Sequence, residues 1–473
     1  MSCFRFAALL ILVSSIGISA AVADDLTNEA RAAMRQAAGY YHKHVAVHGG
    51  YVYHYSEDLS NRWGEGQAGH DQIWVQPPGT PTVGIAFLKA YAATGDEFYL
   101  QAARDAAGAL VFGQLRSGGW SNSIDLALRK EGYPYSGGKK RREGNSSLDD
   151  GQTQTAIRFL VLLDEALDFE DETIHQSATF ALDSLLAAQF ENGAFPQVWR
   201  GPVQQQPVRH ASFPDYDWRT EHRLKNYWDY YTLNDNVCGY VAETLLVAHR
   251  VYDDERYLTA LKRLGDFLLL AQMPDPQPAW AQQYNYEMHP MWARKFEPPA
   301  ISGDESQEAI ETLLAIYAAT GDEKYIQPLP KAIAYLRNSL LSDGQLARYY
   351  ELKTNKPLYM QRKGDVYSLT YDDRNLPSHY SWKTSSRLDR LEAEFKRVKE
   401  KKPLPSVSIK RRQANVREIV SQLDDQGRWL TTYDGERLVG QANFTPGERY
   451  LSSARFSRNL TELAAYVQLT SQE

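Results

Sequence analysis

One ten-residue sequence occurs twice in this chain with small changes, and it constrains the fold more than any other feature. Ala90–Tyr99 has the sequence AYAATGDEFY, and Ile316–Tyr325 has the sequence IYAATGDEKY. A looser copy lies at Val251–Tyr257, and a weaker one surrounds Phe169–Glu172. The copies recur roughly every 70 to 80 residues, a spacing that is too long for the common solenoids and suits long helical hairpins with sizeable loops.

Apolar residues at helical spacing precede these markers. They are Val83, Ala86, Phe87, Ala90 and Tyr91 before the first copy, Ala156, Phe159, Leu160 and Leu163 before the second, and Ile310, Leu313, Leu314 and Tyr317 before the last. This i, i+3, i+4, i+7 pattern is typical of an amphipathic helix. The Thr-Gly-Asp of the marker suits the end of one helix and the N-cap of the next. We therefore expect two helices joined by a tight turn at each marker.

A loop follows the second helix of each hairpin at an equivalent position. The loops are Gln114–Trp120, Gln189–Phe195, Gln272–Trp280 and Leu341–Gly344, with Gly49–Tyr51 as a candidate earlier member. Because equivalent loops on stacked hairpins gather at one end of the assembly, we expect one loop-rich face. The functional site should lie on that face.

The marker number and the chain length favour an all-α protein, an α/α toroid of helical hairpins with a small mixed C-terminal appendage. Few segments alternate as strands do, so an α/β fold is disfavoured. We expect a signal peptide at 1–23, the toroid at 24–383 and the appendage at 384–473. In the appendage, the sequence predicts a charged helix at Arg387–Lys401, a strand-like piece at Trp429–Tyr433 and a last helix near Leu460–Leu469.

The N-terminus has the features of a secretory signal. Arg5 precedes the apolar and small-residue run Phe6–Ala20, and Ala21–Ala23 then matches a small-x-small cleavage site, so the mature chain would begin near Asp24. A membrane anchor is the alternative, but the run is short for a span. We expect a secreted or periplasmic protein with no membrane contact after cleavage.

Charge and cysteine content exclude several classes of function. The formal net charge of −7 argues against bulk nucleic-acid binding. It does not exclude an anionic substrate, because a cleft can be basic on an acidic protein. Only Cys238 would remain after signal cleavage, so the mature chain would hold no internal disulfide and a structural zinc site is disfavoured.

Two clusters of oxygen-bearing side chains stand where helices are expected to begin. They are Leu148–Gly151, with Asp149 and Asp150, and Asn234–Asn236, with Asp235 at its centre. Such residues commonly cap helices by accepting hydrogen bonds from free N–H groups. Two clusters on converging loops could equally form a site of hard oxygen ligands for a cation.

Several ordered motifs resemble the family 10 polysaccharide lyases, the pectic acid lyase group of pectate lyases. They are Ser117–Asn122, Ser147–Thr153, Asn192–Gln197, Tyr231–Asn236, Pro278–Gln283, Trp292–Pro298, Leu346–Glu351 and Tyr380–Trp382. Each motif alone is weak, but together and in order they are specific. The resemblance runs from about Gly118 to Trp382, and the segment Tyr51–Gly113 looks like the extra helical region of longer bacterial relatives.

The resemblance implies a Ca²⁺-dependent enzyme that cleaves polygalacturonate by β-elimination to 4,5-unsaturated products. It assigns calcium and substrate contacts to Asp149, Asp150 and Asp235, with Asn234 as a further metal ligand. It also assigns the role of base at the uronate C5 to Arg294. A guanidinium is normally protonated, so base action requires either neighbouring cations such as Lys295 to lower its pKa or transient deprotonation at high pH. A carboxylate clamp is the alternative role for Arg294.

Other residues of these motifs are candidate substrate contacts. Arg348, Arg362 and Lys363 could bind uronate carboxylates, because guanidinium forks match carboxylates in geometry; salt bridges are the alternative. Aromatic rings can pack on the apolar faces of sugars, although they more often fill a core. The candidate groove walls are Trp120, Trp280, Trp292, Tyr380 and Trp382.

Two other functions stay open on the sequence. A toroid glycoside hydrolase acting on a uronate-containing polysaccharide would need a carboxylic acid and a carboxylate that flank the bond, and Asp149 and Asp235 could be that pair. A non-catalytic carbohydrate-binding protein is also compatible, because a fold does not fix a function. In each case we expect a monomer with a uronate polysaccharide as its partner.

Overall fold

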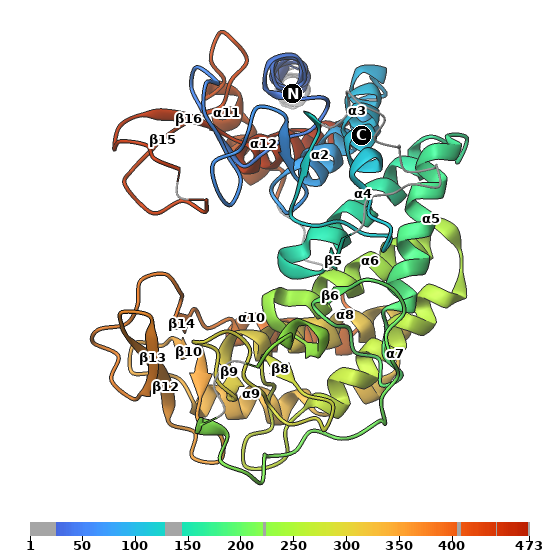
Figure 1. Cartoon of the computed structure of the whole chain (residues 1–473). Helices are drawn as coiled ribbons and strands as arrows, with labels where there is room; N and C mark the ends of the chain where they lie inside the picture. The colour runs from blue at the N-terminus through green and yellow to red at the C-terminus, as the bar shows by residue number, and fades with distance from the viewer. Residues whose placement is uncertain (1–24, 128–143, 221–223, 404–407, 441, 472–473) are drawn as a thin grey trace, which may run out of the picture.

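A computed structural model describes residues 25–127, 144–220, 224–403, 408–440 and 442–471 (Figure 1). The signal-peptide prediction for 1–23 lies outside these residues. Within the part of the chain that is described, no helix combines the length and the apolar character that a bilayer span requires.

Helices dominate the structure and come in antiparallel pairs. Residues 25–40 are helical and continue into η1 (Tyr41–Val45). The helices that follow are α2 (Thr80–Thr94), α3 (Glu97–Gly113), α4 (Gln152–Ala166), α5 (Glu172–Ala187), α6 (Val237–Tyr252), α7 (Glu255–Ala271), α8 (Gly303–Thr320), α9 (Leu329–Asn338), α10 (Leu388–Lys399), α11 (Ile409–Ser421) and α12 (Ser453–Thr470).

The first helix of each pair packs against the first helix of the next. Thus α12 packs on α2, α2 on α4, α4 on α6, α6 on α8 and α8 on α10. The second helices α3, α5 and α7 pack on the outside of α2, α4 and α6. Figure 1 shows these pairs following one another along an arc. The predicted all-α architecture, an α/α toroid of helical hairpins, is confirmed.

The marker sequence forms the turn within a hairpin, as predicted. Gly95 ends α2 in the left-handed region at φ 67°, and its N–H donates to the Tyr91 carbonyl. The Asp96 side chain then caps α3 by accepting from the N–H of Phe98. Gly321 ends α8 in the same way at φ 69°. Glycine adopts this left-handed backbone conformation at low cost, whereas other residues would be strained in it.

The loops that follow the second helices share one hydrogen-bonded turn. A backbone hydrogen bond closes each of the four turns. The N–H groups of Leu115, Phe190, Met273 and Leu341 donate to the carbonyl groups of Gly119, Ala194, Ala279 and Gln345, respectively. Glycine occupies a left-handed position in three of these turns, at Gly118 (φ 94°), Gly193 (φ 93°) and Gly344 (φ 78°). The loops are therefore structurally equivalent, as their sequences indicate.

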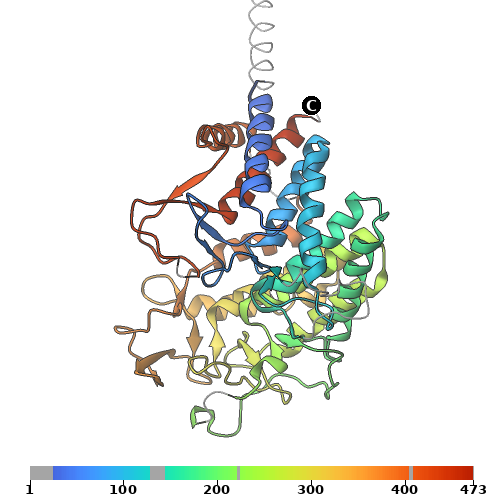
Figure 2. The same ribbon diagram turned by 45° about the horizontal axis from the view of Figure 1, so that its top comes forward.

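Short strands line the loop-rich end, and the sequence did not reveal them. Antiparallel pairs join β3 (Gln72–Trp74) to β4 (Ser123–Asp125), β5 (Ser146–Ser147) to β6 (Val198–Trp199), β7 (Tyr231–Thr232) to β8 (Gln283–Tyr284) and β10 (Leu346–Ala347) to β14 (Lys383–Thr384). A larger sheet has the order β13 (Val366–Thr370), β12 (Pro357–Lys363), β11 (Tyr349–Tyr350) and β9 (Ile301–Ser302). In Figure 2 many of these loops and strands lie below the helices.

The two ends of the chain pack together. Strand β1 (His54–Ser56) lies between β2 (Arg62–Trp63) and β16 (Arg449–Ser452). On its other side, β16 pairs with β15 (Leu430–Thr432). Helix α12 packs on α2, and Tyr41 stacks on Phe456 with 3.8 Å between the ring centroids. The C-terminal segment therefore contributes a helix to the arc itself, while the domain boundaries given above stay predictions.

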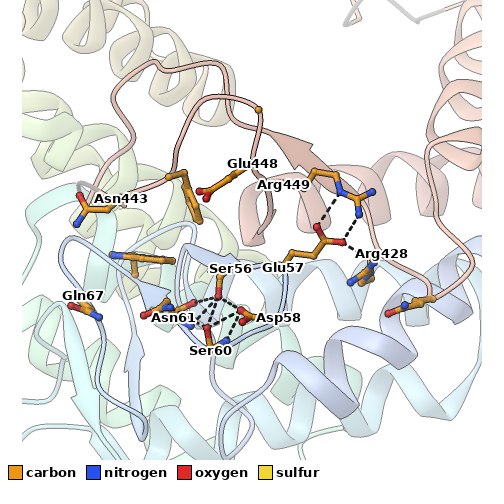
Figure 3. A pocket seen from close by; sticks show the side chains of 14 residues that line it. Ser56, Glu57, Asp58, Ser60, Asn61, Gln67, Arg428, Asn443, Glu448 and Arg449 are labelled. Carbon is orange, nitrogen blue, oxygen red and sulfur yellow. Dashed lines mark hydrogen bonds and ion pairs between the residues drawn. The ribbon is translucent and has the colours of Figure 1, made fainter.

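A polar hollow of about 1030 Å³ lies where these two ends meet (Figure 3). Glu57 accepts hydrogen bonds there from Arg449, at 2.6 Å, and from Arg428, at 3.2 Å. Ser56, Asp58 and Ser60 form a hydrogen-bonded turn on the opposite wall. Arg428 pairs with Asp424 as well, at 2.8 Å, so both arginines of this hollow have carboxylate partners.

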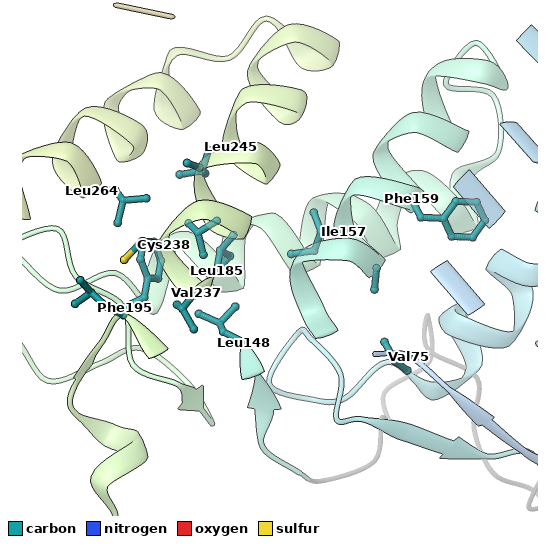
Figure 4. Packing of buried hydrophobic residues seen from close by; sticks show 14 of the residues in the cluster. Val75, Leu148, Ile157, Phe159, Leu185, Phe195, Val237, Cys238, Leu245 and Leu264 are labelled. Atoms are coloured by element: carbon teal, nitrogen blue, oxygen red, sulfur yellow. The ribbon is translucent and has the colours of Figure 1, made fainter. Parts of the chain in front are cut away.

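The core runs under the helix starts at the loop-rich end. Leu148 and Val237, which flank the starts of α4 and α6, are fully buried and lie near one another in Figure 4. Phe195 is 1% exposed and belongs to the core, as expected for this residue. Packing thus fixes the backbone positions from which the polar side chains at these helix starts project.

Gly193 and Gly344 allow a matched test of the equivalent turns. A Cβ at Gly193 would overlap the Arg263 carbonyl, whereas a Cβ at Gly344 meets nothing within 4 Å. Gly344→Ala should cost about 1–2 kcal/mol of unfolding free energy from left-handed strain alone. Gly193→Ala should cost at least ~1–3 kcal/mol more from overpacking. Denaturant unfolding of both variants checks this, and equal losses would contradict the structure.

Candidate functional site

Two acidic turns of the same design form the centre of the site. Strand β5 leads into the short helical turn η3 (Asp149–Gly151) and then α4, and strand β7 leads into η6 (Asn234–Asn236) and then α6. Asp150 and Asp235 occupy the left-handed region at φ 46° and φ 54°. Aspartate tolerates this conformation better than bulkier residues do. The two turns bring consecutive polar side chains toward Arg294.

The two turns contact each other because α4 and α6 are neighbours. The Asp149 carboxyl group is close enough to that of Asp235 to raise the pKa of Asp235. Arg294 bridges them, with its Nη2 3.4 Å from Oδ2 of Asp235 and 3.8 Å from Oδ1 of Asp149. The structure thus brings together three of the residues that the sequence selected.

Asn234 and Gln197 hold the two aspartates in place. The Asn234 side-chain amide donates to Oδ2 of Asp235. The Gln197 amide donates to Oδ1 of Asp149. Both carboxylates keep further oxygen lone pairs for a ligand.

Burial and mutual repulsion shift the acidity of these groups. Burial is the largest cause that raises the pKa of Asp235 well above its usual range, and the contact with Asp149 and the charge of Asp150 raise it further, against the opposing effect of Arg294. The pKa of Asp150 is raised to about 6 by partial burial of its carboxyl group and by the charges of Asp149 and Glu65. The cluster therefore favours either a retained proton or an added cation among its carboxyl groups.

Asp150 faces a different part of the site from Asp149. Its Oδ2 accepts from the Gln76 amide at 2.9 Å, and the same amide donates to Glu65 at 3.0 Å. The Gln152 amide in turn donates to the Gln76 carbonyl oxygen at 3.1 Å. The N-terminal segment thus adds an amide and a carboxylate to the rim of the acidic cluster.

Arg294 lies in a tight turn that a buried glutamate supports. The Glu297 N–H donates to the Arg294 carbonyl at 3.0 Å, and the Arg294 N–H donates to Oε2 of Glu297 at 2.9 Å. Burial of Arg294 opposes its charge, but the carboxylates of Glu297, Asp235 and Asp149 outweigh burial and raise the pKa of the guanidinium. The neighbours of Arg294 are therefore acidic, whereas the base role requires cationic ones.

Arg348 lies below the same cluster and is already paired. Its Nη2 lies 3.0 Å from Glu305 and 3.4 Å from the Asn234 carbonyl oxygen, and its Nη1 lies 3.8 Å from Asp304. Its side chain is 12% exposed. Arg348 thus links η6 to the start of α8, and its role as a substrate clamp stays a prediction.

Tyr380 covers Arg348 and continues the network. The Arg348 guanidinium carbon lies 4.6 Å from the centre of the Tyr380 ring. The Tyr380 hydroxyl donates to Oε1 of Glu297 at 3.0 Å and lies 2.9 Å from the Tyr349 hydroxyl. Tyr380 is half-buried, so one side of its ring borders the cleft.

The structure contradicts the prediction that Trp120 and Trp292 are groove walls. They are 0% and 1% exposed. The Trp120 indole N–H donates to the Leu110 carbonyl at 2.8 Å, and that of Trp292 donates to the Trp218 carbonyl at 2.7 Å. Both rings belong to the core. The same holds for Trp280 and Trp382, which are 0% and 5% exposed.

Arg362 and Lys363 lie away from the acidic turns, near the exposed tip of the β12–β13 hairpin. Arg362 donates to the Gly364 carbonyl at 2.7 Å and pairs with Asp365 at 3.4 Å. The hairpin reaches the site only through Tyr367, whose ring packs on Phe296 two residues after Arg294. Contact of Arg362 and Lys363 with substrate stays a prediction.

Sequence analysis missed Glu297, Gln76 and Glu65. Glu297 stands in the quoted motif Trp292–Pro298, three residues after Arg294, and its side chain is 1% exposed. Buried acids are rare unless paired, so its proximity to Arg294 in the sequence was a usable signal. Gln76 and Glu65 carried no such signal, because only the fold brings them to the cluster.

The described residues contain no group of three or more histidine, cysteine, aspartate or glutamate side chains arranged to hold a metal ion. Asp149 and Asp235 nonetheless offer adjacent carboxylates with spare lone pairs and excess negative charge. This donor set suits a hard cation that takes its remaining ligands from water or from a bound anion.

Comparison with known proteins agrees with the ordered motifs. The family model described as pectic acid lyase matches residues 114–315. This region contains both acidic turns and Arg294, but neither Arg348 nor Arg362. The predicted resemblance is confirmed over that part of the chain, and the class of enzyme it defines is a polysaccharide lyase. A comparison with curated proteins gave no match.

Solved structures with a similar course of the chain come from enzymes of several kinds. A family 10 polysaccharide lyase from Cellvibrio cellulosa, a mutant in complex with trigalacturonic acid, has 20% identity and a TM-score of 0.47, with coverage of 66% of this chain and 98% of the other. Cellobiose 2-epimerase from Bacillus thermoamylovorans has 15% identity and a TM-score of 0.47, with coverage of 93% and 99%. A family 76 glycoside hydrolase from Bacteroides thetaiotaomicron has 11% identity and a TM-score of 0.47, with coverage of 95% and 99%.

A buried glutamate beside the site gives a prediction on pH. Burial, with the charges of Glu305 and Asp304, raises the pKa of Glu308 from 4.5 to about 9. The folded state therefore holds a proton that the unfolded state releases, so the stability from this group is lost as pH rises between about 4.5 and 9. Glu308→Gln mimics the protonated form and should flatten that loss.

Denaturant unfolding at pH 5, 7 and 9 measures the effect. Near pH 5, Glu308→Gln and the wild type should have similar unfolding free energies. Towards pH 9, the unfolding free energy of the variant should exceed that of the wild type by a growing margin. Glu323→Gln, which changes an exposed glutamate, should follow the wild type throughout. A constant difference between Glu308→Gln and the wild type at all three pH values would contradict this assignment.

Proposed function

We propose that this protein is a calcium-dependent pectate lyase that cleaves polygalacturonate by β-elimination. The observation that carries the proposal is the placement of Arg294 between Asp149 and Asp235 in one cleft. Elimination needs a group that removes the C5 proton and a means of stabilising the charge that then develops toward the C6 carboxylate. The three residues offer both within one site.

Arg294 would take the C5 proton, and the aspartates would set the conditions for it. Calcium held by Asp149 and Asp235, with Asp150 and Asn234 at its edge, would neutralise the carboxylates that keep Arg294 protonated and would acidify C5 through the uronate carboxylate. Glu297 orients Arg294 through its backbone and side chain. Tyr380 and Arg348 support this arrangement from below and border the bound sugar.

The position of Arg294 disfavours a hydrolase. Inverting and retaining glycosidases place the scissile bond between their two carboxyl groups. Here one guanidinium nitrogen of Arg294 lies 3.8 Å from the Asp149 carboxyl group and 3.4 Å from that of Asp235. A guanidinium thus takes the place of a scissile bond, so this pair suits a shared cation better than an acid and a nucleophile.

The proposal includes export and a monomeric state. Its basis for export is the signal-like sequence at 1–23, which leads to the periplasm or the medium. Polygalacturonate is too large to enter a cell, so a secreted or periplasmic enzyme meets it or its fragments.

Replacement of Arg294 tests the role of the guanidinium. Arg294→Lys keeps the charge but removes the fork that reaches both aspartates, so turnover should fall by at least ~10²–10⁴-fold. The measurement is the ultraviolet absorbance of the C4–C5 double bond formed from polygalacturonate. Lys396→Ala changes an exposed lysine on α10 and should keep near wild-type turnover. Full activity of Arg294→Lys would refute the assigned role.

Removal of calcium tests the cofactor. A chelator should abolish the lyase activity, and added Ca²⁺ should restore it. Calorimetric titration with Ca²⁺ in the presence of oligogalacturonate should show weaker binding to Asp149→Asn and Asp235→Asn than to the wild type, by about tenfold or more. Asp372→Asn, an exposed aspartate, serves as the control. Undiminished activity of the chelated, metal-free protein would rule out calcium dependence.

A further inference from the structure

A hollow of about 370 Å³ lies beside β6, whose Val198 and Trp199 line it. Asn145, Arg200, Trp228, Asp229 and Tyr286 are among the residues that line it. An adjoining hollow of about 450 Å³ shares Asn145 and Arg200 and adds Arg116. The two hollows form a polar surface next to the candidate site.

One strand connects this hollow to the acidic cluster. Gln197, whose amide donates to Asp149, also accepts at its carbonyl from the Leu148 N–H at 2.8 Å and donates its own N–H to the Trp228 carbonyl at 2.9 Å. On the other side, Tyr227 precedes Trp228 and is among the groups that raise the pKa of Arg294. Because Gln197 contacts both Asp149 and Trp228, a polymer bound at the acidic turns would extend along this strand toward the hollow.

Arg200 differs in its pairing from the two arginines of the site. Arg294 and Arg348 are each within 4.0 Å of carboxylates. The Nε of Arg200 donates to the Asn145 side-chain oxygen, and none of the carboxylates in the described residues forms an ion pair with Arg200. At longer range, the positive charge of Arg200 opposes the rise in the pKa of Asp229 that burial causes. The exposed guanidinium thus keeps its two terminal nitrogens for a ligand carboxylate.

The opposite wall of the hollow is aromatic and held in place. Tyr286 packs on Tyr230 with 4.4 Å between ring centroids, and its hydroxyl donates to the Asp229 carbonyl at 3.1 Å. Trp228 contacts Tyr227 edge to face at 5.1 Å. Fixed rings next to a guanidinium match a uronate residue, which has an apolar sugar face and a carboxylate.

We infer that this hollow is a substrate subsite for a uronate residue beyond those at the cleaved bond, with Arg200 binding its carboxylate and Trp228 packing on its ring. The inference rests on the proposed function and names a part of the cleft that the lyase chemistry itself does not require. It predicts that the enzyme prefers chains long enough to reach Arg200.

Kinetics on substrates of two lengths test this inference. For hexagalacturonate, Arg200→Ala should raise KM about tenfold with little change in kcat, the loss expected for one exposed charge-assisted contact. For trigalacturonate, KM and kcat of Arg200→Ala should stay near those of the wild type. Arg200→Lys should recover part of the loss. Arg256→Ala, an exposed arginine paired with Asp183 and Asp254, should behave as the wild type on both substrates.

Two results would overturn the subsite. One is an unchanged KM for hexagalacturonate in Arg200→Ala, and the other is an equal rise for both substrate lengths. A failure of the proposed function would look different, because the wild type would then cleave neither substrate. In that event, calorimetric binding of hexagalacturonate to the wild type and to Arg200→Ala decides the inference. Weaker binding to the variant supports it, and equal affinity or no binding to either rejects it.

Discussion

Arg294 is the counter-charge on which the polar centre of this protein depends. Its guanidinium faces Asp149 and Asp235 while its own backbone is held by Glu297. Burial and mutual repulsion raise the pKa values of Asp235 and Asp150, so ionised carboxylates here cost free energy unless positive charge lies beside them. The proposed calcium ion would supply that further positive charge.

The helical arc explains how residues far apart in the sequence meet at Arg294. Each hairpin places the start of its inner helix next to the start of the following one, so α4 and α6 bring Asp149 and Asp235 together. The equivalent start of α8 supplies Asp304 and Glu305, which hold Arg348. The loop-rich end is thus a row of similar turns, and the chemistry follows from the residues that each turn carries.

Much of this arrangement could be predicted from the sequence, because it follows from repetition. The marker turns, the equivalent loops and the convergence of Asp149 and Asp235 all derive from hairpins of one design. The tryptophans show the limit of that approach, since Trp120 and Trp292 are buried although their residue type suits a groove equally well. The short strands have too few residues for any periodicity. Gln76 and Glu65 reach Asp150 because α2, which follows them in the chain, packs on α4.

The fate of solvent oxygen tests the central claim, that Arg294 and the two aspartates perform elimination. Polygalacturonate would be digested in water enriched in ¹⁸O, and the products would be analysed by mass spectrometry. Elimination breaks the C4–O4 bond without adding water, so the new ends should be unsaturated and free of ¹⁸O apart from exchange at the reducing carbon. Hydrolysis adds one water across the bond, so saturated products, each heavier than its unsaturated counterpart by one water, would contradict the account.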